Sequence, residues 1–367
     1  MNQNNTTGIY IHIPFCKSKC PYCDFYSMRA DNELKDRYLS AVIDELATFD
    51  NVKIYDTIYF GGGTPTEFGA DRIVRVLNFI RENYKLAENT EITLECNPQS
   101  DLLDLFSEVM VTGVNRISIG CQSIHDNELK SLGRLAKIND IEKAINDARK
   151  AGIFNISVDL MLGIPHQTKE SLLKSLQFFI DKKIPHISCY MLQIEEGTIF
   201  QKRINRLSLP DENSVSELYE ILTNTLNHAG VNQYEISNFA VKGFESKHNL
   251  RYWNLTDYYG IGPSAHSLIN NSRYYYERDI EKYITARKKI YDGNGNTYDE
   301  YIILQLRLTN GLSLTKLKEN YGFAFAKKKL TVIENYVKAG YLIEENDNIK
   351  LTTKGMLASN RIIADLL

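Results

Sequence analysis

The chain has 367 residues, of which 43% are hydrophobic and 24% charged, so it can bury a sizeable core and is not disordered throughout. Lys and Arg number 43 against 46 Asp and Glu, and this balance excludes the basic excess typical of nucleic-acid-binding proteins. No stretch reaches the roughly 20 apolar residues of a membrane span, and no signal peptide is legible. We therefore expect a soluble, cytoplasmic protein without a nucleic-acid partner.

The first two thirds of the chain alternate short β-rich runs with amphipathic helical patterns. A helix capped by Asp31 has Leu34, Tyr38, Val42 and Leu46 on one face, and later helices are predicted around 73–80, over 100–112, up to Ala151 and over 168–182. Six β-then-α units imply parallel strands with right-handed crossovers. An eight-unit barrel needs about 250 residues of this rhythm, so we predict a partial, open (β/α)6 barrel. The predicted strands are residues 8–13, 57–60, 91–95, 116–120, 156–161 and 187–193, and residues 233–237 offer one more.

The last third of the chain has a different pattern. Residues 238–296, rich in Tyr, Asn, Gly and Ser, are predicted to be an ordered connection that follows a barrel domain over 1–237. Residues 297–367 predict a winged-helix-like domain with helices at 298–308, 313–320 and 326–338, a hairpin at 341–351 turning at Asp347-Asn348, and a final helix. Because the chain is not basic and a fold alone assigns no DNA role, we interpret this domain as a packing or lid module.

Three of the six cysteines crowd into eight residues directly after the first predicted strand. Cys16, Cys20 and Cys23 have the spacing C-x3-C-x2-C. Three thiolates on one loop can hold three corners of a 4Fe–4S cluster and leave one iron open. A structural zinc site would need a fourth ligand, for which His12 is the only nearby candidate, and a redox pair would need only two cysteines. The spacing, together with a reducing compartment, favours the cluster.

The cysteine loop resembles the signature of the radical S-adenosylmethionine (SAM) enzymes. Its flanking residues, from Tyr10 to Cys16 and from Cys23 to Phe25, are similar to those of the oxygen-independent coproporphyrinogen III oxidase-like family, and above all to its haem-chaperone branch. The resemblance covers nearly the whole chain. It is carried by GGGTPT (61–66), ECNP (95–98), RISIGCQS (116–123), LGR (132–134), DLMLGIPHQT (159–168), residues 186–200, HNLRYW (248–253) and GIGPSAHS (260–267).

Several of these motif residues fall at the carboxyl ends of predicted strands, which form the active-site rim of a parallel barrel. Gly62 and Gly63 have no side chain, so a ligand can approach their backbone. Asp159 stands in a largely apolar strand and needs a partner, for which a ribose diol would serve. Arg134 can hold a carboxylate through two hydrogen bonds, which matches the methionine end of SAM.

The resemblance implies a residue-by-residue cofactor site. Cys16, Cys20 and Cys23 would hold a 4Fe–4S cluster, and a reductant would supply it with the electron that cleaves SAM to a 5′-deoxyadenosyl radical. The positions that match SAM contacts in the family are Tyr10, Tyr22, Gly62, Gly63, Thr64, Glu95, Gln122, Arg134, Asp159 and Gln193.

The HNLRYW motif is the expected second site. The resemblance implies that haem is a cargo passed to recipient haemoproteins, with His248 as an axial ligand and Tyr252 and Trp253 against the porphyrin. The alternative is a loop histidine that is hydrogen-bonded to the backbone. We expect this connection to fold against the mouth of the barrel, and we expect His266 to be structural.

The competing function is that of the oxidase itself, which removes two propionate carboxyl groups from coproporphyrinogen III. The oxidase carries a further cysteine where this chain has Phe25, and it has a longer segment before the cysteine loop. We therefore do not expect decarboxylation, and a purely structural iron–sulfur protein would not explain the rim residues. Two departures from the family pattern are Ala136, where relatives have His, and Pro263-Ser264 in the glycine-rich turn.

Overall fold

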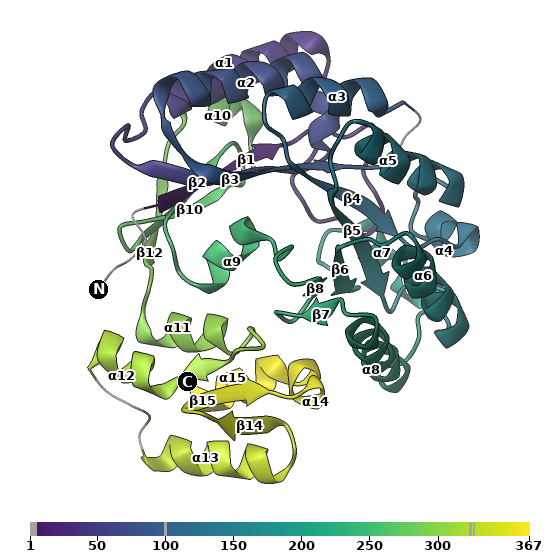
Figure 1. The fold of residues 1–367 in the computed structure, drawn as a ribbon, viewed down its shortest axis with the longest axis vertical. Helices are drawn as coiled ribbons and strands as arrows, with labels where there is room; N and C mark the ends of the chain where they lie inside the picture. The colour runs from purple at the N-terminus through teal and green to yellow at the C-terminus, as the bar shows by residue number, and fades with distance from the viewer. Residues whose placement is uncertain (1–5, 99–100, 323–324, 326) are drawn as a thin grey trace.

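The computed structural model describes residues 6–98, 101–322, 325 and 327–367. Its main feature is one curved sheet wrapped by helices on its outer side (Figure 1). The described strands of this sheet lie in the order β12-β11-β10-β9-β1-β2-β3-β4-β5-β6-β8-β7. The six central strands β1 to β6 are neighbours in sequence order and pair in parallel, which confirms the predicted partial (β/α)6 barrel.

Each βα unit lies where the hydrophobic pattern predicted it. The first five strands are somewhat longer than predicted, because parallel pairing continues into polar flanks, as where Ile54 pairs with Lys85, whereas β6 ends two residues before the predicted 193. The strands are β1 (Thr6–Ile13), β2 (Ile54–Gly62), β3 (Lys85–Cys96), β4 (Arg116–Gln122), β5 (Asn155–Leu162) and β6 (His186–Met191). The helices are α1 (Asn32–Leu46), η1 (Pro65–Phe68), α2 (Ala70–Asn83), α3 (Leu103–Val111), α4 (Asp126–Ser131), α5 (Ile138–Lys150), α6 (Lys169–Asp181), α7 (Ile199–Lys202), η2 (Ile204–Arg206) and α8 (Glu212–His228).

Local capping explains where several of these helices begin and end. The Asp31 carboxylate accepts the Leu34 N–H at 2.9 Å and starts α1, as predicted. The Thr168 hydroxyl accepts the Ser171 N–H at 3.2 Å and starts α6. Gly152 follows α5 with a φ of +90°, a conformation that favours glycine and turns the chain toward β5. Residue 100, the predicted start of α3, and residue 326, the predicted start of α13, lie outside the described residues.

The two faces of the central strands differ in polarity, and this locates the core. In β5, Ile156, Val158 and Leu160 are buried against the surrounding helices, whereas Ser157 and Asp159 face the inside of the barrel. The inner face is thus polar along much of its length. The hydrophobic core therefore lies between the sheet and the helices, and the barrel interior is free to carry chemistry.

Residues 232–294 extend the same sheet on both sides of the barrel strands. On the side of β6 lie β7 (Asn232–Gln233) and β8 (Asn238–Ala240). The strand predicted over 233–237 is therefore wrong, because most of that segment forms the turn between β7 and β8. On the other side β9 pairs in parallel with β1 through Gly8 and Tyr258, and three antiparallel strands follow. The further elements are α9 (Lys247–Trp253), β9 (Tyr258–Ile261), β10 (His266–Ile269), β11 (Ser272–Tyr275), α10 (Ile280–Ala286) and β12 (Ile290–Asn294).

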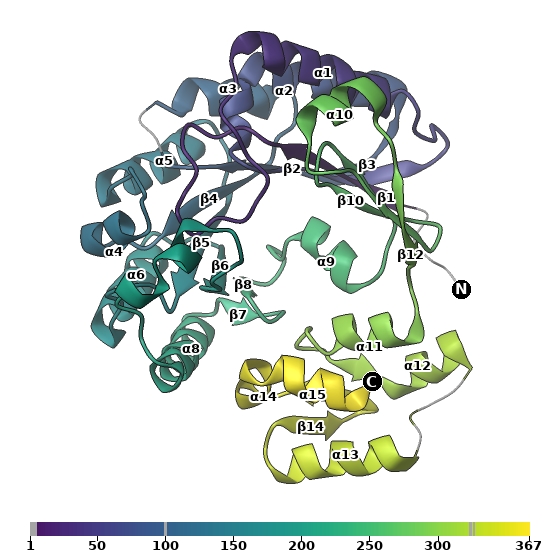
Figure 2. The same cartoon turned by 180° about the vertical axis from the view of Figure 1, so that it is seen from behind.

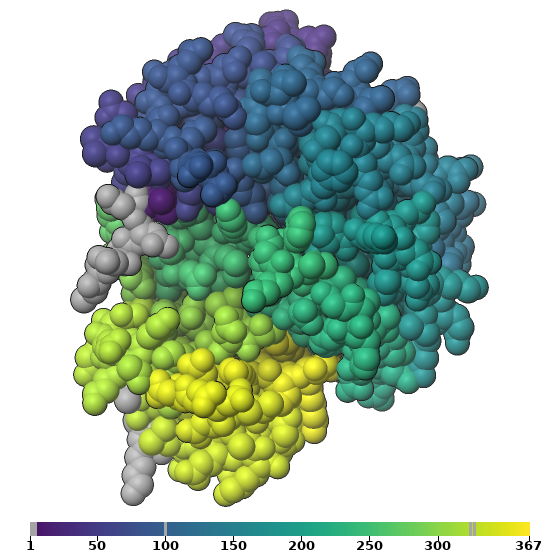
Figure 3. Space-filling view, viewed as in Figure 1, coloured from purple at the N-terminus to yellow at the C-terminus, as the bar shows by residue number. Residues whose placement is uncertain are grey.

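The C-terminal residues form a small domain with helices and a three-stranded antiparallel sheet of order β13-β15-β14, which confirms the winged-helix-like prediction. Its hairpin turns at Asn346-Asp347, one residue earlier than predicted, and both residues have positive φ. The domain closes the lower side of the barrel (Figure 3). Its elements are α11 (Tyr298–Gln305), β13 (Leu312–Ser313), α12 (Leu314–Tyr321), α13 (Lys327–Lys338), β14 (Leu342–Glu345), β15 (Asn348–Leu351), α14 (Thr353–Leu357) and α15 (Ser359–Leu366).

None of the helices in the described part of the chain is both long and apolar enough to cross a membrane.

Candidate metal centre and cofactor site

The cysteine loop leaves β1 at its carboxyl end and folds back on itself. Backbone bonds close the base of the loop, because the Cys16 N–H donates to Met28 O at 2.9 Å and the Met28 N–H donates to Pro14 O at 2.8 Å. Within the loop, the Cys23 N–H donates to Cys20 O. The three thiols are half-buried and form no disulfide. Figure 2 shows this purple loop in front of the barrel, on the side where the parallel strands end.

The donor set of this loop fits a 4Fe–4S cluster better than a structural zinc ion. Within the described ranges, no three His, Cys, Asp or Glu side chains converge on one point as the ligands of a single ion would. A cubane instead takes one thiolate for each of three irons. His12 is not a spare fourth ligand, because its Nε2 donates to Tyr26 O at 3.0 Å and its Nδ1 accepts from the Tyr10 hydroxyl at 3.1 Å. Burial lowers the pKa of His12 to about 4, which keeps the ring neutral.

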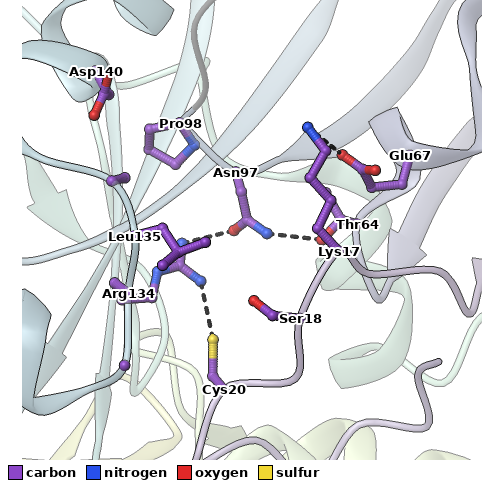
Figure 4. Close-up of a pocket in the computed structure, with 12 residues that line it drawn as sticks. Lys17, Ser18, Cys20, Thr64, Glu67, Asn97, Pro98, Arg134, Leu135 and Asp140 are labelled. Atoms are coloured by element: carbon purple, nitrogen blue, oxygen red, sulfur yellow. Dashed lines mark hydrogen bonds and ion pairs between the residues drawn. The ribbon is translucent and has the colours of Figure 1, made fainter. Parts of the chain in front are cut away.

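A pocket of about 310 Å³ opens beside Cys20 (Figure 4). It combines the cysteine loop with residues that follow β2, β3 and α4, so that three carboxyl-end loops meet in one place as a parallel barrel requires. A Lys17–Glu67 ion pair of 3.5 Å closes one side. The lining residues are Lys17, Ser18, Cys20, Thr64, Glu67, Asn97, Pro98, Gly133, Arg134, Leu135, Ala136 and Asp140.

A continuous hydrogen-bond chain runs through this pocket from one thiol to another. Arg134 Nη1 donates to Cys20 Sγ at 3.7 Å, and Arg134 Nη2 donates to Asn97 Oδ1 at 2.7 Å. Asn97 Nδ2 in turn donates to Thr64 Oγ1 at 2.7 Å, and Thr64 Oγ1 lies 3.4 Å from Cys16 Sγ. Arg134 also donates to Gly120 O, which fixes its guanidinium at the rim. Arg134 thus lies next to Cys20, and its predicted role in holding the SAM carboxylate stays a prediction.

Asn97 is a functional candidate that the sequence reasoning missed. It is the first residue after β3, and its place in the ECNP motif at a strand end was the signal that could have found it. Its amide orientation follows from Arg134, which can only donate, so that Oδ1 faces Arg134 and Nδ2 faces Thr64.

The glycines after β2 are required for packing rather than for open space. Gly62 has a φ of +108°, and a Cβ there would lie 2.5 Å from His12 Cε1. A Cβ on Gly63 would lie 2.8 Å from Phe15 O. The turn therefore lets the β2 strand end press against β1 and the base of the cysteine loop. This differs from the expectation that the glycines mainly leave room for a ligand.

Two half-buried carboxyl groups lie close to the rim. The Glu95 carboxylate accepts from the Tyr59 hydroxyl at 2.7 Å and from the Gly62 N–H at 3.2 Å, and burial raises its pKa to about 7. Burial also raises the pKa of Asp159, although hydrogen bonds from Ser188 and Ser118 oppose this. Asp159 thus has hydrogen-bond partners within the protein, whereas the sequence analysis expected its partner to be a ribose diol.

The remaining predicted SAM contacts are distributed along the rim. Tyr10 is half-buried in β1, and the Tyr22 ring lies 6.1 Å from the Phe200 ring. Gln122 ends β4 at an irregularity in the pairing with β5 and has a φ of +69°. Gln193 lies on the exposed loop after β6, and no hydrogen bond joins it to the other predicted contacts in the described part of the chain. Of the ten predicted SAM contacts, Thr64 and Arg134 line the pocket beside Cys20, and the role of the others stays a prediction.

Comparisons with known proteins agree with this geometry. Residues 10–179 match the radical SAM superfamily, and residues 296–358 match the HemN C-terminal domain. The haem chaperone HemW of Lactococcus lactis subsp. lactis is 34% identical over 98% of this chain and 96% of its own length, and that of Bacillus subtilis is 33% identical over 98% of each. The chain belongs to the HemW family. The solved coproporphyrinogen III oxidase (HemN) of Escherichia coli has the same fold, with a TM-score of 0.84 at 22% identity over 98% of this chain and 89% of its own.

In this HemW-family chain the HNLRYW motif forms α9, at the opposite end of the barrel from the cysteine loop (Figure 1). Arg251 donates to Thr6 O and to Asp257 O and pairs with Asp56, which lie at or next to the amino ends of their strands. The expectation that this segment folds against the barrel mouth is wrong. The sequence analysis treated this motif as part of an ordered connection and predicted no helix there, and no local pattern indicates to which end of the barrel the connection of residues 238–296 returns.

His248 is buried and fully hydrogen-bonded in α9. Its Nδ1 lies 2.9 Å from Thr57 Oγ1 and its Nε2 lies 2.9 Å from the Tyr252 hydroxyl, and its ring stacks on Tyr59 at 5.2 Å. The side chain is 1% exposed, and burial lowers its pKa to about 3. The ring is thus neutral, as an iron ligand must be, but both nitrogens already have partners.

His266 does not pack into the glycine turn as a structural residue would. Its imidazole is exposed on β10, stacks on Tyr275 at 5.1 Å and lies 3.8 Å from Asp292. Its backbone, rather than its ring, makes the close contact with Gly260, where an added Cβ would lie 2.0 Å from His266 O.

Proposed function

We propose that this protein is a haem chaperone, which binds haem and transfers it to haemoproteins. The observation that carries this proposal is the likeness to HemW proteins over 98% of the chain. The cysteine loop with its adjoining pocket supports a 4Fe–4S cluster and SAM as resident cofactors, which the superfamily also implies. We further propose that the protein works in the cytoplasm, because half-buried thiols that hold a cluster need a reducing compartment. A cellular reductant for the cluster is then a second partner, beside the recipient haemoprotein.

The residues that would hold the cofactors follow from the site. Cys16, Cys20 and Cys23 would ligate the cluster, which when bound supplies an electron to SAM. Arg134 would orient the SAM carboxylate with the donors that Asn97 and Gly120 leave free. Thr64 would donate a hydrogen bond to the Cys16 thiolate. The other proposed SAM contacts are Tyr10, Tyr22, Gly62, Gly63, Glu95, Gln122, Asp159 and Gln193.

The alternative function is the oxidative decarboxylation of coproporphyrinogen III. The likeness to HemN concerns the fold alone, since the identity is 22%. Phe25, which stands where the oxidase has its further cysteine, is 66% exposed beside the cysteine loop and cannot ligate a metal. This residue favours the chaperone.

A single experiment separates the two functions. The anaerobically reconstituted protein is offered haem in one reaction, and coproporphyrinogen III with SAM and a reductant in another. We expect a Soret band from bound haem and no SAM-dependent formation of protoporphyrinogen IX. Robust product formation without haem binding would reverse the assignment.

Haem can bind at the proposed contacts His248, Tyr252 and Trp253 only if an existing hydrogen bond breaks. For an iron to reach Nε2 of His248, Tyr252 must give up a hydrogen bond of 2.9 Å at the end of the barrel opposite the cysteine loop. Haem binding by this motif would therefore require α9 to move, and this role stays a prediction.

A further inference from the structure

The rim of the barrel carries a basic segment next to the cysteine loop, formed by residues 199–206 (IFQKRINR) of α7 and η2 and called here the basic lip. Its three cations, Lys202, Arg203 and Arg206, are exposed, and their side chains make no ion pair or hydrogen bond with any described residue. A net charge of +3 in eight residues stands out in a chain whose total is −3. Unpaired cations gathered in this way attract an anionic ligand.

The basic lip also exposes apolar surface. Ile199 and Ile204 are 44% and 48% exposed. Behind them lies a small apolar cluster, separate from the main core, which comprises Leu132, Met161, Ile164 and Phe200 with the half-buried Tyr22, Leu192, Ile194 and Leu207. A segment that is both apolar and cationic suits an amphipathic anion better than a simple phosphate or carboxylate.

Two contacts tie the basic lip to its surroundings. The Phe200 N–H donates to Pro21 O at 3.0 Å, which joins the lip directly to the cysteine loop. The His166 N–H, in the loop after β5, donates to Ser208 O at 3.2 Å, just beyond the lip. The His166 imidazole is exposed and makes no hydrogen bond with another described residue. The backbone of His166 is therefore joined to the chain just beyond the lip, and its exposed imidazole is available to a ligand.

We propose that the basic lip is a docking site for haem, with the two propionates on Lys202, Arg203 and Arg206, the macrocycle against Ile199 and Ile204, and His166 as an axial ligand. The inference rests on the proposed chaperone function and assigns a place to its cargo. It follows from charge complementarity, since haem is an apolar plane with two carboxylates and an iron that accepts imidazole. Docking here needs no movement of α9.

The other six histidines are less suited to this role. His12, His186 and His248 are buried with both ring nitrogens engaged. The remaining three have partners of their own: His125 and His228 bond to the backbone, and His266 stacks on Tyr275.

The test is a haem titration of the reconstituted full chain, read by Soret absorption. We expect His166→Ala to shift the Soret band and to weaken haem binding about tenfold, whereas binding of metal-free protoporphyrin IX stays unchanged because that ligand has no iron. The triple variant Lys202→Ala, Arg203→Ala and Arg206→Ala should weaken the binding of both tetrapyrroles about tenfold and reduce its salt dependence. The matched control replaces three exposed lysines of the C-terminal domain by alanine. It should change neither the binding of the two tetrapyrroles nor its salt dependence. These lysines are Lys316, Lys318 and Lys338.

Iron content and circular dichroism check that each variant keeps its cluster and fold. If His166→Ala and the lip variant bind haem as the wild type does while His248→Ala does not, the lip assignment is overturned but the chaperone function stands. If His166→Ala weakens the binding of protoporphyrin IX as much as that of haem, His166 is not an iron ligand. If the wild-type protein binds no haem, the chaperone function itself fails.

Discussion

The hydrogen-bond chain between Cys16 and Cys20 makes a sharp prediction about the cluster. Because Asn97 Nδ2 donates to Thr64 Oγ1, the Thr64 hydroxyl proton is left to point at Cys16 Sγ, 3.4 Å away. Asn97→Asp keeps the shape but replaces the donor with an acceptor. The Thr64 hydroxyl then turns toward the carboxylate, and the Cys16 thiolate loses its donor while a negative charge is added nearby. Both changes make reduction of the cluster harder, so its reduction potential should fall.

The expected size follows from the geometry. A hydrogen bond to a charged group contributes about 1.5–3 kcal/mol, and we take the lower end because the contact is long and the loop half-exposed. The reduction potential shifts only by the part of this free energy that differs between the oxidised and the reduced cluster. For one electron, 59 mV corresponds to about 1.4 kcal/mol. We therefore expect a fall of about 30–60 mV in Asn97→Asp. Thr64→Val removes the same donor without adding charge and should give the smaller shift of the two.

The assay is a potentiometric titration of the anaerobically reconstituted cluster, monitored by electron paramagnetic resonance. Iron and sulfide content of each variant serves as the control for intact assembly. An unchanged or raised potential in both Asn97→Asp and Thr64→Val, with a full cluster, would refute the proposed direction of the Thr64 hydroxyl.

Three further predictions concern assembly, pH and packing. Cys20→Ser should lower the iron content below the about four atoms per chain of a cubane and abolish the effect of SAM on its spectrum, and a full cluster would contradict the ligand assignment. Burial raises the pKa of Glu235 from 4.5 to about 7, so the native state holds its proton more tightly, and the contribution of Glu235 to the free energy of unfolding should fall by up to about 3 kcal/mol from below pH 4.5 to above pH 7. Urea unfolding at pH 5 and pH 8 should show a smaller difference in Glu235→Gln. His248→Ala should destabilise the protein by about 2–4 kcal/mol through lost buried hydrogen bonds with Thr57 and Tyr252, measured by thermal unfolding, and equal stability would show that these bonds are weak.

The barrel could be predicted from sequence because its signals are local. Apolar runs separated by capped helices, such as the one that begins at Asp31, specify a βα unit without reference to the rest of the chain. The cysteine loop was equally local. The strands β9 to β12 were not predicted, because each has only four or five residues and no apolar run. They form only by pairing with other strands of the folded sheet.

The site was less predictable where it depends on how separate loops meet. Asn97 has no spacing signal, and its role became visible only when Thr64 and Arg134 were found on either side of it. The position of α9 depends on Arg251, which pairs with residues of β1, β2 and the start of β9. Such contacts are encoded by no periodicity in the sequence.

The pairing of β1 with β9 has a consequence for biosynthesis. Gly8 and Tyr258 are partners although 258 − 8 = 250 positions separate them, so one edge of β1 stays unpaired until β9 has been made. At 5–20 residues per second this interval lasts roughly 10–50 s. An uncovered strand edge is a template for pairing with another chain. Nascent or truncated chains that end before Tyr258 should therefore aggregate or require a holding factor, however complete their βα units are.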